Sequence, residues 1–295
     1  MRIEPTGEIL GASVHDIDLS HPIDDAAFRQ IAQALGDHGV ICFKNQNLEP
    51  EAQKAFAARF GTLEINVAAG PYTVPGHPEV MILSNRVEDG RPVGLGDAGQ
   101  GWHTDMSYSK EIAFANVLYA IEIPRRNGRP LGSTLFANMH AAFTDLPDDL
   151  KARLVDKEAI HDFEKFWEMM RARPGSTRGP LTDEQRAKKP PVPHPIFLTH
   201  PITGTKVLYC NPGYATRIVG MDENESDDTL NFLFEHQLQE KYQYAHQWTE
   251  GDVLMWENIG TLHNAISDYG PDEPRYIRRC QIMADKVFEP SFVAA

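Results

Sequence analysis

The feature that most constrains the fold is the tripeptide His103-Thr104-Asp105, followed far along the chain by His263. Residues two apart in an extended segment point the same way, so His103 and Asp105 can reach one ion if residues 102–107 are extended. Two histidines and one carboxylate occupy one face of an octahedron and leave positions open, as in non-haem Fe(II) oxygenases. A third ligand so distant in sequence requires a fold that brings remote strands together, and a barrel does this.

Length and charge limit the classes of protein to which this chain can belong. With 295 residues, the chain is long enough for one large β domain. The net charge of −14 counts against a nucleic-acid or membrane partner, including a nucleic-acid demethylase. No secretory signal or membrane-spanning apolar run is visible. The cysteines are odd in number and widely spaced, so we expect reduced thiols in a cytoplasmic protein; they are Cys42, Cys210 and Cys280.

Strand-like segments dominate the pattern. Helices are expected between Asp24 and Gly39, from Pro50 to about Gly61, and over residues 141–154 and 225–239. The expected strands cover Val40–Phe43, 80–84, 114–123, 133–136, 159–163, 196–199, 207–210, 242–248, 252–256 and 275–283, with a hairpin turn at Thr203-Gly204. The sequence therefore predicts one domain over residues 1–295, mainly β with flanking helices, folded as a double-stranded β-helix (jelly roll).

Two stretches lack regular periodicity. Residues 85–101 are rich in glycine and precede His103, which predicts an active-site loop. Residues 171–195 are rich in proline and basic residues, which predicts a long surface excursion.

An arginine-rich segment follows His263. Arg275, Ile277 and Arg279 share one face of the expected strand. Inside a barrel, two guanidinium groups require bound anions or facing carboxylates. The same segment alone also fits an edge strand with solvated arginines, and the nearby metal residues favour the interior position.

Together, these motifs resemble the taurine dioxygenase family of Fe(II)- and 2-oxoglutarate-dependent oxygenases, which includes the chlorophenoxyacetate dioxygenases. The resemblance covers nearly the whole chain, through residues 11–19, Ala58-Arg59-Phe60-Gly61, Trp102-His103-Thr104-Asp105, Gly132-Ser133-Thr134-Leu135-Phe136, His200-Pro201, Thr216-Arg217-Ile218, Trp256-Glu257-Asn258, His263 and the Arg275/Arg279 pair. It implies the jelly-roll fold and Fe(II), 2-oxoglutarate and O2 as cofactor and cosubstrates.

The resemblance also implies residue roles. His103, Asp105 and His263 would bind iron, while Arg275 and Thr134 would hold the distal carboxylate of 2-oxoglutarate. The implied reaction oxidises a C–H bond, above all by hydroxylation, and releases succinate and CO2. Halogenating relatives lack the carboxylate that Asp105 supplies, so halogenation is not expected.

The substrate side of the site differs from taurine dioxygenase. The corresponding positions hold Asn66, Ala69 and Gly99, which counts against taurine and indicates a roomier pocket. Arg279 stands where taurine dioxygenase grips the sulfonate, so it binds the substrate anion or pairs with an internal acid. The expected substrate-binding residues are Arg279, Asn66, Met106, Tyr108, Phe163 and Tyr214. We expect a small carboxylate, sulfonate or phosphonate as substrate, and leave a homo-oligomer open.

Two other functions use the same residues. A zinc-dependent hydrolase would need a tetrahedral site and a general base beside it. A non-catalytic jelly-roll binding protein would have lost a metal ligand or the oxoglutarate arginine, and both are present.

Overall fold

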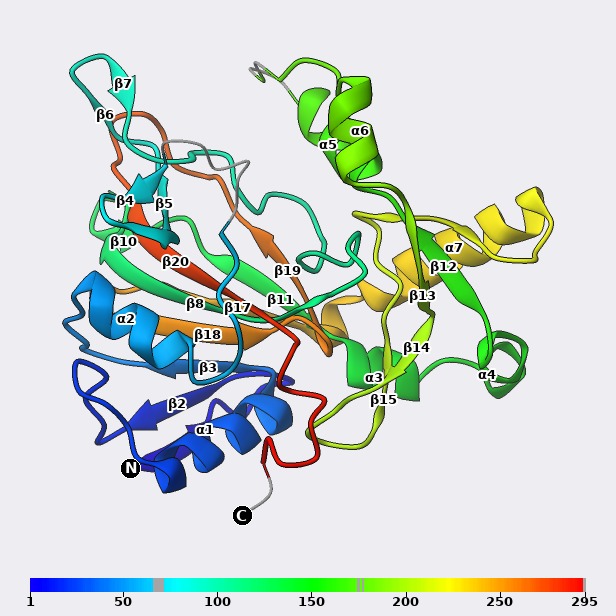
Figure 1. Cartoon of the computed structure of the whole chain (residues 1–295), viewed down its shortest axis with the longest axis horizontal. Coiled ribbons are helices and arrows are strands. Elements are labelled where there is room, and N and C mark those ends of the chain that lie inside the picture. Colours follow the sequence, from blue (N-terminus) through cyan, green and yellow to red (C-terminus); the bar gives the residue numbers. More distant parts are fainter. Residues whose placement is uncertain (66–71, 174–175, 177, 294–295) are drawn as a thin grey trace.

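The computed structural model describes residues 1–65, 72–173, 176 and 178–293, and its centre is a large sheet (Figure 1). Across this eight-stranded sheet the order is β1 (Arg2–Pro5), β2 (Ala12–His15), β3 (Val40–Phe43), β18 (Val253–Glu257), β8 (Ala113–Glu122), β20 (Tyr276–Met283), β5 (His77–Ser84) and β4 (Thr73–Val74). Strand β20, which carries the arginines, pairs with β8 on one side and β5 on the other. It is therefore a central strand, and the edge-strand interpretation of the arginine segment is wrong.

Two helices cover one face of the sheet. Helix α1 (Asp25–His38) packs on β3 and β18, and α2 (Pro50–Ala57) packs on β20, β5 and β8. Helix α1 is capped by the Asp24 carboxylate, which accepts from the Ala27 amide, and Gly39 ends it at φ +67°. This confirms the first predicted helix. The second begins at Pro50 as predicted but ends before Gly61, whose position leaves no room for a Cβ against the Met283 carbonyl.

A second, smaller sheet closes the barrel. It contains β17 (Gln243–His246), β11 (Thr134–Asn138) and β19 (Thr261–Ala265). From β11, Phe136 packs edge-on against Trp256 of β18, with ring centroids 5.4 Å apart. The apolar layer between the two sheets confirms the predicted mainly β, jelly-roll core.

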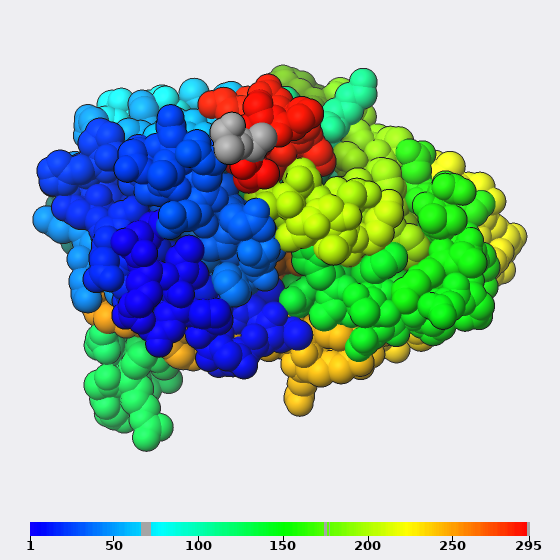
Figure 2. All heavy atoms as spheres, turned by 90° about the horizontal axis from the view of Figure 1, so that it is seen from below, coloured from blue at the N-terminus to red at the C-terminus, as the bar shows by residue number. Residues whose placement is uncertain are grey.

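The described residues between β11 and β17 form a second half of the molecule, green to yellow in Figure 2. Its strands are β12 (Glu158–His161), β13 (Val192–Pro195), β14 (Phe197–Thr199), β15 (Lys206–Leu208) and β16 (Ala215–Ile218), and its helices include α3 (Met139–Thr144), α4 (Asp148–Leu154), α7 (Glu223–Gln237) and the short η2 (Glu240–Tyr242). Strands β14 and β15 form the hairpin predicted at Thr203-Gly204. Pro147 splits the helix predicted over 141–154 into α3 and α4. Helix α7 buries Leu230 and Leu233 within its own chain, against β16 and α3.

The two irregular stretches contain regular elements. The glycine-rich stretch forms the hairpin β6 (Val87–Glu88) and β7 (Arg91–Pro92), and a further hairpin pairs β9 (Arg125–Arg126) with β10 (Arg129–Pro130). The stretch expected as a surface excursion contains α6 (Asp183–Lys188), with a reciprocal cap between Thr182 and Gln185, and strand β13. Residues 163–171 form helix α5 (Phe163–Arg171) and not a strand end, because the Asp162 carboxylate caps it.

No helix among the described residues is long and apolar enough to cross a membrane. All three cysteines are buried free thiols, as expected.

Candidate active site

His103, Asp105 and His263 lie together between the two sheets. The backbones of His103 and His263 exchange two hydrogen bonds, of 3.1 and 2.8 Å. The Asp105 carboxylate oxygens lie 3.6 Å from His103 Nε2 and 3.8 Å from His263 Nε2. One donor atom from each residue lies within 4.8 Å of the other two. This spacing fits three protein ligands on one face of a metal ion.

The predicted extended conformation of residues 102–107 is wrong. Residues 102–107 are not extended: His103 makes a single bridge, and the chain turns over residues 105–108 with Met106 at φ +54°. The hydroxyl of Thr104 donates to the Asn258 carbonyl at 2.5 Å and ties the turn to the end of β18. The turn, rather than strand alternation, brings Asp105 beside His103.

A hydrogen bond orients His103 as a ligand, and burial does the rest for His263. His103 Nδ1 lies 2.7 Å from the Gly101 carbonyl, which can only accept, so Nδ1 carries the proton and Nε2 is free to bind a metal. Burial and then the neighbouring His103 hold the pKa of His263 well below its usual value. The His263 ring therefore fits the neutral form that metals require. Gly213 lies so close that a Cβ there would meet His103 Cβ at 2.8 Å.

Asp105 is held by two side chains. Arg279 Nη2 donates to Asp105 Oδ2 at 2.9 Å, and Asn116 Nδ2 donates to the same oxygen at 2.8 Å. Arg279 Nε also donates to Asn116 Oδ1 at 2.8 Å. Burial opposes ionisation, yet the positive charge of the Arg279 guanidinium holds the pKa of Asp105 below its usual range. Asp105 is thus an oriented carboxylate, and Arg279 contacts an internal acid, one of the two expected partners.

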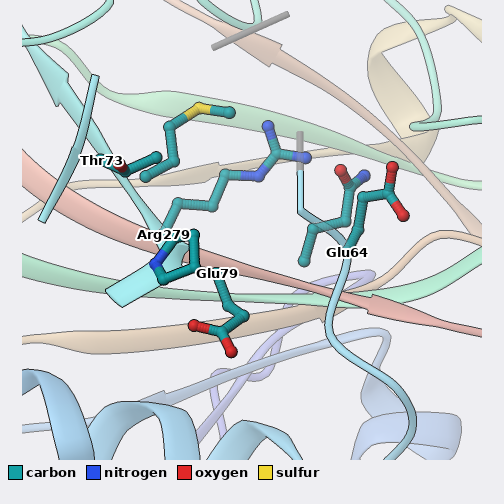
Figure 3. Close-up of a pocket in the computed structure, with 7 residues that line it drawn as sticks. Glu64, Thr73, Glu79 and Arg279 are labelled. Carbon is teal, nitrogen blue, oxygen red and sulfur yellow. The ribbon is translucent and has the colours of Figure 1, made fainter. Parts of the chain in front are cut away.

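Arg279 also reaches a pocket, shown in Figure 3. The lining residues are Glu64, Thr73, Pro78, Glu79, Met81, Arg279 and Gln281. Two of them are acids, so this pocket offers an incoming anion a mixed environment. Of these residues, only Arg279 was expected from the sequence.

Arg275 is a buried cation without an acidic partner among the described residues. Its side chain is 7% exposed, it forms no ion pair with an acid of the described residues, and its Nε has no hydrogen-bond partner there. Burial lowers its pKa, which Tyr269 opposes. Gly132 packs beside Tyr269 and Arg275, since a Cβ there would lie 3.0 Å from the Tyr269 ring and 3.5 Å from Arg275 Nε. An unpaired buried guanidinium costs several kcal/mol, so the site fits a carboxylate such as the distal one of 2-oxoglutarate.

Strand β11 connects this arginine to the triad. Thr134 lies two residues after Gly132, and Phe136 lies opposite His263 across the β11–β19 pair. The Thr134 hydroxyl accepts a 3.0 Å hydrogen bond from Trp248 Nε1. Trp248 and Asn116 carry no local sequence signal of these contacts, which only the fold creates.

An aromatic wall, defined here as Tyr108, Phe163, Phe166 and Tyr214, extends from His103. Ring centroids are 4.8 Å apart for His103–Phe166, 5.1 Å for Phe166–Tyr214, 4.9 Å for Tyr214–Tyr108 and 4.9 Å for Tyr108–Phe163. The structure thus brings together three of the expected pocket residues. Phe166 was missed, although Asp162 followed by apolar residues at positions 163, 166, 167 and 170 is a helix signal.

The remaining expected residues are placed as follows. Met106 lies in the turn after Asp105. Gly99 accepts a 2.9 Å hydrogen bond from the Ala265 amide at the end of β19. Asn66 and Ala69 lie outside the described residues.

A second buried cluster contains His140, His200 and Glu257. His200 Nδ1 accepts from the amides of Ile202 and Thr203 at 3.3 and 3.2 Å. The proton of the neutral ring therefore sits on Nε2, which faces a Glu257 oxygen at 3.5 Å. Within this cluster, His200 and Glu257 form a polar pair, and Glu257 also accepts from the amides of the turn after β18, so these side chains are not free metal ligands.

Comparison with known proteins agrees with this geometry. Residues 2–281 match the family model described as taurine catabolism dioxygenase TauD, TfdA family. The chain is 32% identical to pentalenolactone F synthase of Streptomyces avermitilis, over 96% of this chain and 94% of that protein. It is 31% identical to the alpha-ketoglutarate-dependent 2,4-dichlorophenoxyacetate dioxygenase of Cupriavidus pinatubonensis, over 96% of this chain and 98% of that protein.

Among solved structures, AAD-2 in complex with Mn(II) and N-oxalylglycine superposes with a TM-score of 0.80 at 27% identity, over 97% of both chains. These similarities span both sheets and both halves of the molecule. The predicted family, jelly-roll fold, enzyme class and cofactor set of Fe(II), 2-oxoglutarate and O2 are confirmed at the level of the family. The chain belongs to the TauD/TfdA family of dioxygenases.

Proposed function

We infer that this chain hydroxylates a C–H bond of a small anionic organic substrate and releases succinate and CO2. The observation that supports this most strongly is the buried Arg275, a cation without an acidic partner in the described residues. It directly precedes β20, the strand that carries Arg279, and Arg279 pairs with Asp105 of the triad. His103, Asp105 and His263 would hold Fe(II). Together, bound Fe(II), 2-oxoglutarate and O2 supply the oxidant.

The protein's own residues bind and orient. Arg275 would pair with the distal carboxylate of 2-oxoglutarate, and the Thr134 hydroxyl would donate to the same group. Asp105, fixed by Arg279 and Asn116, occupies a ligand position that a halide would otherwise take, which supports hydroxylation. The aromatic wall excludes water beside His103.

An anionic substrate is supported by two observations. The 2,4-dichlorophenoxyacetate in the name of the Cupriavidus relative is an aryloxyacetate, an aromatic ring linked through oxygen and one methylene to a carboxylate. The aromatic wall beside the triad fits the apolar body of such a molecule, and the Lys189 cation lies at its margin. No observation favours the zinc hydrolase or the non-catalytic protein.

The test is turnover under ¹⁸O2 with Fe(II), 2-oxoglutarate and a panel of small carboxylates, sulfonates and phosphonates. We expect one ¹⁸O atom in succinate and one in a hydroxylated product, with the two products formed in equal amounts. A desaturated product without added oxygen would contradict hydroxylation. Oxidation of neutral panel members alone would contradict the anionic substrate class.

A further inference from the structure

Arg279 pairs with Asp105 and is therefore a poor candidate to bind the substrate's anionic group. Two of the Arg279 donors already bind Asp105 and Asn116, and two acids line its pocket. The chain carries a net charge of −14, so an organic anion needs a local cation to enter. A cation other than Arg279 is therefore needed beside the aromatic wall to attract the anion.

Lys189 is such a cation. It follows α6 directly, and its Nζ lies 4.2 Å from the ring centroid of Phe163 and 4.8 Å from that of Tyr108. It also lies 3.5 Å from the Tyr108 hydroxyl. Half-buried on two ring faces, the ammonium group is fixed in direction and partly stripped of water, which strengthens its attraction for an anion.

Lys189 also lacks a competing acid. It forms no ion pair with any acid in the described part of the chain, and residues 66–71, 174–175 and 177 contain no aspartate or glutamate. Glu64 is the acid whose charge acts on it, at a longer range than an ion pair. The neighbouring Lys188, by contrast, is exposed and paired with Glu184 at 2.8 Å.

The aromatic wall joins Lys189 to the triad. Tyr108 contacts Lys189 at one end, and Phe166 contacts His103 at the other, with Tyr214 between them. Helices α5 and α6, which supply Phe163 and precede Lys189, project together from the strands β12 and β13 (Figure 1). The four rings thus form one continuous apolar cluster between His103 and Lys189.

We propose that Lys189 binds the anionic group of the prime substrate while the aromatic wall binds its apolar body, so that the carbon farthest from the charge is presented to the metal site. The substrate class is an aryl or alkyl chain with a terminal carboxylate, sulfate or sulfonate. This rests on the proposed function, and it assigns the anion to Lys189 rather than to Arg279.

The experiment measures anaerobic binding to the Fe(II)- and 2-oxoglutarate-loaded enzyme by calorimetry. The probes are phenoxyacetate and hexyl sulfate, each compared with its neutral counterpart, phenoxyethanol or hexanol. We expect wild type to bind at least one anion roughly tenfold or more tightly than its neutral counterpart, since a charge-assisted contact is involved. Lys189→Met should abolish this preference, Lys189→Arg should keep most of it, and the exposed neighbour Lys188→Met should keep all of it.

Three outcomes overturn the proposal: no anion preference in wild type, a preference that survives in Lys189→Met, or one that disappears in Lys188→Met as well. The charge-transfer absorption of Fe(II) with 2-oxoglutarate, measured before any probe is added, separates this failure from that of the proposed function. That absorption should be unchanged in Lys189→Met.

Discussion

Arg279 and Asp105 form an ion pair inside the active site, with Nη2 2.9 Å from Oδ2. Asn116 completes the arrangement, because it donates to the same carboxylate oxygen and accepts from Arg279 Nε. The carboxylate is thereby fixed with its other oxygen toward His103. Arg279 is thus a positioning residue for a metal ligand.

Removing this arginine should weaken metal binding. We expect Arg279→Gln to lower the affinity for Fe(II) by roughly tenfold or more, as loss of a partner of a ligating carboxylate does. Arg279→Lys should restore part of it, since the charge remains. Metal competition titrations measure this, with exposed Arg129→Gln as the control. An unchanged affinity in a folded Arg279→Gln would show that Asp105 needs no such support.

Trp248 should direct the Thr134 hydroxyl. An indole N–H only donates, so Thr134 Oγ1 accepts from it and its own hydrogen is left to donate elsewhere. We expect Trp248→Phe to raise KM for 2-oxoglutarate by up to roughly tenfold, with a smaller effect on kcat. Trp167→Phe, which loses an indole hydrogen bond to Gly179, should leave that KM unchanged. Equal effects of the two variants would contradict this role.

Gly213 should be required for the position of His103. In Gly213→Ala, the new Cβ would lie 2.8 Å from His103 Cβ and 3.2 Å from the Trp102 carbonyl, so one of these groups must move. We expect a clear loss of Fe(II) affinity in a folded protein. The control is Gly179→Ala, because a Cβ at Gly179 meets nothing within 4 Å. Metal titration measures the Fe(II) affinity of both variants, and circular dichroism shows whether both are folded.

His161 should make stability depend on pH. It is fully buried, and burial, then His194 and Lys165, lowers its pKa to about 3. The unfolded chain binds this proton near pH 6.5, and the folded chain binds it only near pH 3. The contribution of His161 to the free energy of unfolding is therefore fully present above pH 6.5 and is lost as the pH falls from 6.5 towards 3. From pH 7 to 5, this residue alone should cost about 2 kcal/mol.

Denaturant unfolding of wild type and His161→Leu at both pH values tests this. The variant should lose about 2 kcal/mol less than wild type over the interval. The same substitution at exposed His21 should not change the pH dependence. A parallel pH dependence of wild type and His161→Leu would contradict a neutral buried His161.

Local signals predicted part of this architecture. Asp24 and Gly39 mark the ends of α1, and Val40–Phe43 forms the predicted strand, because caps and short apolar runs act within a few residues. Helix α5 was missed because the strand before it, β12, runs directly into its cap at Asp162. No turn residue separates the two elements there.

The metal-ligand residues of the site could be predicted from the sequence, but the residues that orient them or contact the aromatic wall could not. His103, Asp105 and His263 carry their chemistry in the side chain, so their pattern is visible in the sequence. Asn116, Trp248 and Lys189 are ordinary residues until the fold places them beside Asp105, Thr134 and the aromatic wall. The turn over residues 105–108 likewise depends on a long-range contact, from Thr104 to Asn258.

We expect the triad and Arg275 to form one site for Fe(II) and 2-oxoglutarate. The most direct measurement is an anaerobic titration of Fe(II)-loaded protein with 2-oxoglutarate, followed by visible charge-transfer absorption. Wild type should show the band, His103→Ala should lack it, and Arg275→Gln should need roughly tenfold or more 2-oxoglutarate, while exposed Arg217→Gln matches wild type. A folded, iron-loaded wild type without the band, or an Arg275→Gln titration identical to it, would contradict the account.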